Sequence, residues 1–227
     1  MSLIASLGGR RIQRRSVHGP AVETYVLDDS NYSVVQHVTD PDTHLMTVIN
    51  GVVAALPDKH LATRGKVVLH PGTYTDARIF TNGRVDIVSS TLGTPGFSPR
   101  DVHLHSASDL TDQLLAGTGT QEGLCIMAGI YVPGSAVAGV HHDGGSGANQ
   151  CTLVYYKCEM GTAGSYGCLS VCSHANSQFH FLDSKMLGSA YAHNWPDVEA
   201  DGGPCLIVYD GTDYESTGIT ERYQYER

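Results

Sequence analysis

Apolar residues between positions 43 and 90 first follow a helical spacing and then form short runs. Thr43–Leu56 (THLMTVINGVVAAL) spaces its apolar residues as an amphipathic helix does, and Pro57 follows it. Three short runs come next, at Val67–Leu69, Arg78–Phe80 and Val85–Val88. The turn signals Pro71-Gly72 and Asn82-Gly83 separate them. This pattern predicts a helix followed by three strands.

The stretch from Arg64 to Ser90 reads RGKVVLHPGTYTDARIFTNGRVDIVSS. A helix, then GKVVLHPGTYT, then strand-turn-strand resembles the start of a right-handed parallel β-helix of the pectin-lyase-like kind, which is common in phage tailspikes and other viral surface proteins. The resemblance implies an all-β fold: a single-stranded parallel β-helix over residues 41–227, capped by the helix at 43–56. A β-sandwich is the alternative, because sandwiches also have short strands and Gly-rich turns.

Two sets of internal similarity support stacked coils. Cys151–Thr162 aligns with Gln178–Ser189 at an offset of 27 residues. The runs that begin at Cys125, Cys168 and Cys205 form the second set, at offsets of 43 and 37. Because stacked coils bring equivalent residues into ladders, we expect these three cysteines to share one ladder.

The amino-acid composition limits the kinds of partner that we expect for this chain. The 227 residues include 26 Gly and only 16% charged residues, which suits a turn-rich β fold. A net charge of −9 disfavours nucleic acid as a partner. No apolar run approaches the roughly 20 residues of a membrane span, so we expect no membrane partner. The start MSLIASLGGRR does not have the charge order of a secretory signal, which predicts synthesis in a cytosol and six reduced cysteines.

The first 40 residues are predicted to form an extended arm. Its second half contains an extended Tyr25–Leu27 and a second candidate strand, Tyr32–Val38. Four arginines lie within six residues of this acidic chain: Arg10, Arg11, Arg14 and Arg15. Such a cluster favours an electrostatic tether to a negatively charged surface. In a viral protein that surface is the major capsid or tail protein; a solvated arm without a partner is the alternative.

Viral β-helices commonly trimerise side by side, and the resemblance implies a homotrimer here. Four apolar residues are candidates for outward positions between subunits: Ile130, Leu153, Tyr155 and Phe181. The alternative is that they belong to a wider core.

The chemistry expected of an enzyme on this fold is missing from the sequence. The Asn-Thr-Asp, Asp-Asp and Gly-His-Gly signatures of polygalacturonase-like chains do not occur in the β-rich part, so we assign no catalytic residue. Six carboxylates remain at expected strand ends: Asp86, Asp183, Asp197, Glu199, Asp210 and Asp213. A pair of them about 5–10 Å apart could hydrolyse a glycoside. Solvated turn carboxylates are the interpretation we favour.

His103 and His105 alternate with Val102 and Leu104, so both histidines should point outward if the apolar residues face the core. They are weak metal candidates near a three-fold axis, and plain surface histidines are the favoured alternative. No cysteine spacing matches a common zinc pattern. We therefore expect no metal and no cofactor.

Gly188–Gly203 is predicted to be a long insertion between coils, and it contains the only Trp of the chain. Tyr191, Trp195 and Asp197 in this segment suit either a subunit interface or a glycan, since sugar rings stack on aromatic faces. Loop packing is the third alternative.

These observations together predict a structural protein on the surface of a tailed virus, assembled in the host cytoplasm as a capsid decoration or short spike. It would stabilise the particle or contact the host surface. The alternatives from other classes are a carbohydrate-active enzyme, such as a polysaccharide lyase or hydrolase, and a glycan-binding receptor-binding protein.

Overall fold

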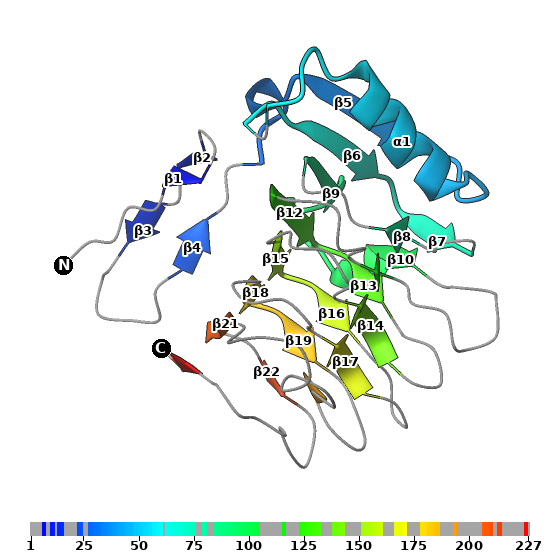
Figure 1. Cartoon of the computed structure of the whole chain (residues 1–227). Coiled ribbons are helices and arrows are strands. Elements are labelled where there is room, and N and C mark those ends of the chain that lie inside the picture. The colour runs from blue at the N-terminus through cyan, green and yellow to red at the C-terminus, as the bar shows by residue number, and fades with distance from the viewer. Residues whose placement is uncertain are drawn as a thin grey trace.

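Short β-branched and aromatic runs pair into parallel sheets in the computed structural model (Figure 1), which is mostly β with parallel sheets. The structure describes residues 27–60, 62–75, 84–104, 123–132, 151–160 and 178–186, and elsewhere only the backbones of short strands. Within these residues the chain contains one α-helix, α1 (Leu45–Ala55), and the 3-10 helices η1 (Asp29–Asn31) and η2 (Pro99–Asp101).

The largest sheet has eight parallel strands. In spatial order these are β5 (Val34–Val38), β6 (Gly65–Leu69), β9 (Val85–Ser89), β12 (Gly123–Ala128), β15 (Cys151–Tyr156), β18 (Gln178–Leu182), β21 (Leu206–Asp210) and β23 (Tyr225–Glu226). The predicted strands at 67–69 and 85–88 are confirmed as β6 and β9. β5 lies in the second half of the predicted arm, so Val34–Val38 belong with the sheets.

The other parallel strands of the described parts form three smaller sheets. A six-stranded sheet contains β7 (Gly72–Tyr74), β10 (Val102–Leu104), β13 (Tyr131–Val132), β16 (Glu159–Met160), β19 (Lys185–Met186) and β22 (Asp213–Tyr214). A three-stranded sheet contains β14 (Ala138–Asp143), β17 (Tyr166–Val171) and β20 (His193–Asn194), and a two-stranded one contains β8 (Ile79–Phe80) and β11 (Leu115–Ala116).

From β12 onward the chain visits the three larger sheets in a fixed order. It passes from the eight-stranded sheet to the six-stranded and then to the three-stranded sheet with β12, β13 and β14, and repeats this with β15, β16 and β17 and with β18, β19 and β20. This parallel pairing differs from that of a β-sandwich, whose strands are antiparallel. β20 lies inside the predicted insertion 188–203, which therefore contributes a strand of its own.

The register corrects the internal alignment. Gly123 pairs with Cys151, 28 positions on, and Thr152 pairs with Gln178, 26 positions on. The predicted offset of 27 between β15 and β18 is therefore wrong by one residue. In the observed register Tyr155 lies beside Phe181, both buried on the same face. A slip of one residue would set a side chain that faces the core beside one that faces away from it.

The predicted cysteine ladder is also wrong. Cys125 lies on β12 in the eight-stranded sheet, whereas Cys168 lies on β17 in the three-stranded sheet. Cys205 is outside the described residues. Cys125 and Cys168 are 43 positions apart, whereas neighbouring strands of the eight-stranded sheet are 26 to 28 positions apart. The predicted alignment therefore matched strands that belong to different sheets.

The core lies between the sheets, and the eight-stranded sheet has buried apolar residues on both faces. One buried cluster joins its inward residues, including Ile87, Met127 and Tyr155, to those of the six-stranded sheet, including Leu104 and Met160. A second cluster lies on its outer face, where Leu27 and Leu92 pack against buried strand residues. Strands buried on both sides read as continuous apolar runs, which explains the uninterrupted burial of β6 and β9.

Three of the four residues expected between subunits belong to this core. Ile130, Tyr155 and Phe181 are each at most 2% exposed and lie in the inner cluster. Their burial within one chain supports the wider-core alternative. The side chain of Leu153 is outside the described residues.

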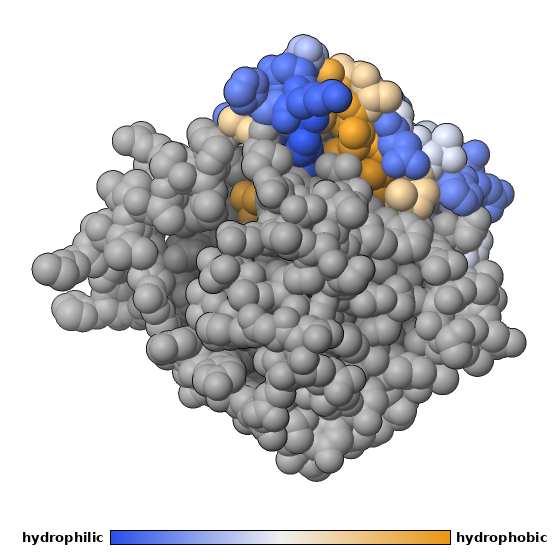
Figure 2. All heavy atoms as spheres, viewed as in Figure 1, coloured by the Kyte–Doolittle hydropathy of each residue, from blue (hydrophilic) through white to orange (hydrophobic). Residues whose placement is uncertain are grey.

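α1 covers the amino-terminal end of the sheets, as the sequence predicts (Figure 1). Leu45, Ile49 and Val52 are buried on its inner face. The helix ends at Ala55 because Leu56 precedes Pro57 and adopts extended dihedral angles. Its sequence has no charged residue, and Figure 2 shows apolar atoms at the surface of this end.

Among the described strands, the first four, which lie in the arm, pair in antiparallel fashion. β1 (Ser6–Leu7) pairs with β2 (Arg10–Arg11), and β3 (Gln13–Arg15) pairs with β4 (Val22–Thr24). Figure 1 shows these strands beside the parallel sheets rather than within them.

Candidate functional site

A cleft opens on the outer face of the eight-stranded sheet, near the end that α1 covers. Its volume is about 410 Å3, within the range of roughly 300–1,000 Å3 usual for ligand pockets. β6, β9 and β15 supply its floor, and the residues before β5 and after β9 form its walls. Its aliphatic lining comes from Leu27, Val68, Val88 and Leu92, and its polar lining from Asp29, His37, Lys66, Ser89, Ser90 and Lys157.

Lys66 and Asp29 form an ion pair within this lining. The Lys66 ammonium also donates to the carbonyl oxygen of Leu27 at 2.7 Å and lies 5.0 Å from the centre of the Tyr32 ring. The Lys66 side chain is only 4% exposed. Lys66 therefore fastens the wall formed by residues 27–32 to the sheet, and Asp29 balances its charge.

A second, fully buried charge pair lies beside Lys66. Arg64 Nη2 donates to Asp86 Oδ1 at 2.6 Å, and the hydroxyl of Tyr32 donates to Asp86 Oδ2 at 2.6 Å. The amide of Ile126 donates to Asp86 Oδ1 at 2.8 Å, and Arg64 also donates to the carbonyl oxygen of Leu124. The network joins the start of β5 to β6, β9 and β12.

Asp86 was predicted to be a solvated turn carboxylate, and this is wrong. It is the second residue of β9 and is 0% exposed. Burial of a carboxylate is sustained by its paired guanidinium and its hydrogen-bond donors, which satisfy both oxygens. The pair is a scaffold for the cleft wall.

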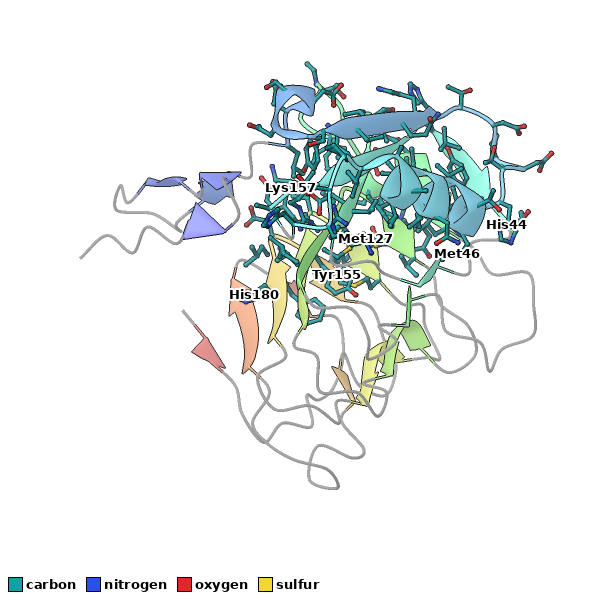
Figure 3. The ribbon with its side chains drawn as sticks, turned by 45° about the horizontal axis from the view of Figure 1, so that its top comes forward. His44, Met46, Met127, Tyr155, Lys157 and His180 are labelled. Carbon is teal, nitrogen blue, oxygen red and sulfur yellow. The ribbon has the colours of Figure 1, made fainter. Side chains whose placement is uncertain are left out.

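Lys157 differs from Lys66 in its surroundings. Its ammonium lies 5.2 Å from the centre of the Tyr156 ring, and in the described part of the chain no carboxylate pairs with it. Figure 3 shows Lys157 away from the start of α1, where His44 precedes the helix and Met46 lies in its first turn. Lys157 is therefore the charged group of the cleft that remains available to a ligand.

The backbone of Lys157 is in the left-handed region, with φ of 52°. Lys157 lies in the turn between the eight-stranded and six-stranded sheets. The equivalent turns of the coils before and after it carry Gly129, with φ of 70°, and Asp183, with φ of 46°. A left-handed conformation costs a residue with a Cβ about 1–2 kcal/mol. Gly129 avoids this cost, whereas Lys157 and Asp183 do not.

Two histidines meet at the edge of the cleft. His37 Nδ1 lies 3.1 Å from His70 Nε2, and His37 Nε2 lies 3.9 Å from Asp29 Oδ2. One of the two facing ring nitrogens must carry a proton and the other accept it. Together with Asp29 they offer hydrogen-bond donors and acceptors at the mouth of the cleft.

A row of outward side chains crosses the six-stranded sheet at a second surface. His103 pairs in register with Tyr131, and Tyr131 with Glu159. Arg100 donates to Glu159 Oε1 at 2.9 Å and lies 4.8 Å from the centre of the Tyr131 ring. Burial raises the pKa of Tyr131, and the nearby Arg100 charge partly opposes that rise. The groups of this row contact one another, since the centre of the His103 ring lies 5.0 Å from that of Tyr131 and Arg100 lies on both Tyr131 and Glu159.

His103 points away from the core as expected, since Val102 and Leu104 on either side of it are fully buried. His105 is outside the described residues, and so are Tyr191, Trp195 and Asp197. The four arginines of the arm have described backbones in β2 and β3, but their side chains are outside the described residues. These site predictions therefore remain predictions.

The described side chains contain no group of three or more His, Cys, Asp or Glu placed to hold a metal ion. Cys125 and Cys158 are buried thiols rather than disulfides. Complete burial raises the pKa of Cys158 to about 12, which removes its thiolate at neutral pH. Cys158 is therefore an inert part of the core.

Comparisons with protein-family models, with curated proteins and with solved structures found no match to this chain. Within the described ranges, no helix has the length and apolar character needed to cross a membrane.

Proposed function

We propose that the chain is a right-handed, single-stranded parallel β-helix that assembles as a homotrimer on the outside of a tailed virus particle. There it serves as a structural protein of the capsid or tail. The observation that carries this proposal is the recurrence of parallel strands in three sheets in a fixed order, with α1 over one end. Stacked parallel coils give a rigid projection whose backbone polar groups are satisfied within each sheet.

The arm supplies the attachment in this proposal. Arg10 and Arg11 lie in β2, and Arg14 and Arg15 in β3, in antiparallel pairs that do not join the parallel sheets among the described strands. The whole chain has a net charge of −9, so these four residues concentrate positive charge at one end of the sequence. A cationic arm would bind an acidic surface of the major capsid or tail protein.

Trimerisation would strengthen this attachment. Three arms on one trimer would bind several shell subunits at once, and simultaneous engagement raises the apparent affinity without new contacts. A protein that binds only the assembled shell stabilises the assembly, since it shifts the equilibrium toward the bound state.

The test combines the mass in solution with attachment to particles. Light scattering should give the mass of a trimer, and a monomer would contradict the assembly. The unmodified protein should sediment together with virus particles. A variant with Gln in place of all four arginines, Arg10, Arg11, Arg14 and Arg15, should stay in the supernatant. The matched variant with four Lys keeps the charge and should still sediment. Equal attachment of the Gln and Lys variants would contradict the electrostatic tether.

Contact with a host surface glycan is the second role, and the cleft near Lys157 favours it over turnover. Glycoside hydrolysis needs two carboxyl groups on either side of the scissile bond. Among the described residues that line the cleft, Asp29 is the one carboxylate, and it is paired with Lys66. A binding site without catalysis needs only a concave surface with a few polar groups, which the cleft has.

A further inference from the structure

We infer that the cleft beside Lys157 binds an acidic sugar, that is, a monosaccharide unit that carries a carboxylate. This inference rests on the proposed contact with a host glycan and names the ligand class and the residue that selects it. The cleft lies on the outer face of the eight-stranded sheet, between β15 and the wall at residues 27–32.

The charges of the lining favour an anion. Lys66 and Lys157 bring two positive charges and Asp29 one negative charge. Lys66 and Asp29 pair with each other, so the charge left over is that of Lys157. A carboxylate that reached Lys157 would gain a charge-assisted hydrogen bond in a partly enclosed site. The chain as a whole carries a net charge of −9, so a cleft whose lining has a net positive charge differs from the average of the molecule.

The rest of the lining suits a sugar ring better than an inorganic ion. Val88 and Leu92 offer aliphatic surface, on which the C–H face of a pyranose can pack. Ser90, His37 and Asp29 place hydroxyl, imidazole and carboxylate groups around it, and these can bond to ring hydroxyls. The volume of about 410 Å3 exceeds what a single phosphate would fill.

The backbone at Lys157 suggests a direct test of its side chain. The same turn one coil earlier carries Gly129, the residue that adopts a left-handed conformation without strain. Lys157 and Asp183 have the same conformation at a conformational cost, and of the two only Lys157 lines the cleft. Replacing either residue by Gly therefore relieves the backbone, but only the change at Lys157 alters the lining.

Lys157→Gly separates binding from folding. It removes the ammonium and also relieves the left-handed conformation, so the variant should fold at least as stably as the unmodified protein. Asp183→Gly is the matched control, because Asp183 has the same conformation one coil later and does not line the cleft. Calorimetric titration with sodium glucuronate, glucose and inorganic phosphate, together with the melting temperature of each variant, measures both effects.

We expect glucuronate to bind the unmodified protein and the Asp183→Gly variant equally, and to bind Lys157→Gly about tenfold more weakly or not at all. Glucose should bind the unmodified protein no more tightly than glucuronate binds the Lys157→Gly variant. Phosphate binding as tight as that of glucuronate would overturn the inference, and so would absence of glucuronate binding or equal loss in both variants. The proposed trimer and the proposed tether are tested separately, by the mass in solution and by sedimentation. Failure of the sugar-binding inference can therefore be told apart from failure of the proposed assembly.

Discussion

Arg64 and Asp86 form a buried ion pair 22 positions apart in the chain, with Nη2 2.6 Å from Oδ1 and side chains that are 4% and 0% exposed. The pair links the residue before β6 to the second residue of β9, and the Ile126 amide extends the link to β12. A buried charge of this kind depends on its partner, because each side chain alone would be an uncompensated charge in the interior.

Asp86→Ala should therefore be strongly destabilising. It leaves the Arg64 guanidinium buried, and loss of one member of a buried pair costs about 3–5 kcal/mol. Denaturant unfolding measures the change in the free energy of unfolding. Replacing both residues, Arg64→Met with Asp86→Leu, should be less damaging than Asp86→Ala alone. Asp58→Ala is the control, since Asp58 is exposed and lies 3.9 Å from Arg84. An equal effect of Asp58→Ala and Asp86→Ala would contradict this account.

Two glycines at the α1 end should respond to alanine in opposite directions. A Cβ on Gly65 would lie 2.2 Å from Val52 Cγ1, so Gly65→Ala should push α1 away from β6 and destabilise the protein. Gly51 lies within α1 and a Cβ there meets nothing within 4 Å. Gly51→Ala should stabilise the protein by about 1 kcal/mol, the difference in helix propensity. Thermal unfolding of both variants checks the pair, and a Gly65→Ala variant as stable as the unmodified protein would contradict the close approach.

The stack of Tyr155 on Phe181 provides a test of the register. Their ring centres are 5.1 Å apart and the rings are 11° from parallel. Phe181→Ala should cost about 3–5 kcal/mol of unfolding free energy. In a double-mutant cycle with Tyr155→Ala, the two residues should couple by about 0.5–1.5 kcal/mol, as aromatic pairs do. If the strands were paired at an offset of 27, Tyr155 would lie level with Leu182, and the cycle with Phe181 should show little coupling.

Local patterns were enough to predict the elements, because they depend on neighbours in sequence. The apolar spacing of Thr43–Leu56 gave α1, and the runs before Pro71 and after Asn82-Gly83 gave β6 and β9, within a few residues. The register between coils depends instead on which face of each strand is buried. Cys125 and Cys168 had similar neighbours in sequence, but they lie in different sheets.

The cleft was missed because its lining comes from four separate segments. Lys157 follows β15, Lys66 lies on β6, and Asp29 precedes β5. One signal was present: Gly129, Lys157 and Asp183 each follow a strand of the eight-stranded sheet and recur at the observed repeat of 28 and 26 positions. Only the correct register makes that series visible, and the offset of 27 set Lys157 beside Ser184 instead.

The pH dependence of stability should depend on His180. This residue lies on β18, in register with Val154 and Val208, and burial lowers its pKa below the ordinary value near 6.5. In the interval between the two pKa values the unfolded chain binds more protons than the folded protein, so stability falls as the pH falls below about 6.5. Above that value the neutral imidazole is common to both states, and the effect is absent.

His180→Leu should remove this part of the pH dependence, because the leucine has no proton to gain. Denaturant unfolding between pH 5 and pH 8 gives the slope of the unfolding free energy for each protein. His60→Ala is the control, since His60 is exposed and hydrogen-bonds through its backbone to Asp58 and Thr63. The slope should fall in His180→Leu and stay unchanged in His60→Ala; an unchanged slope in His180→Leu would show that other groups set the acid sensitivity.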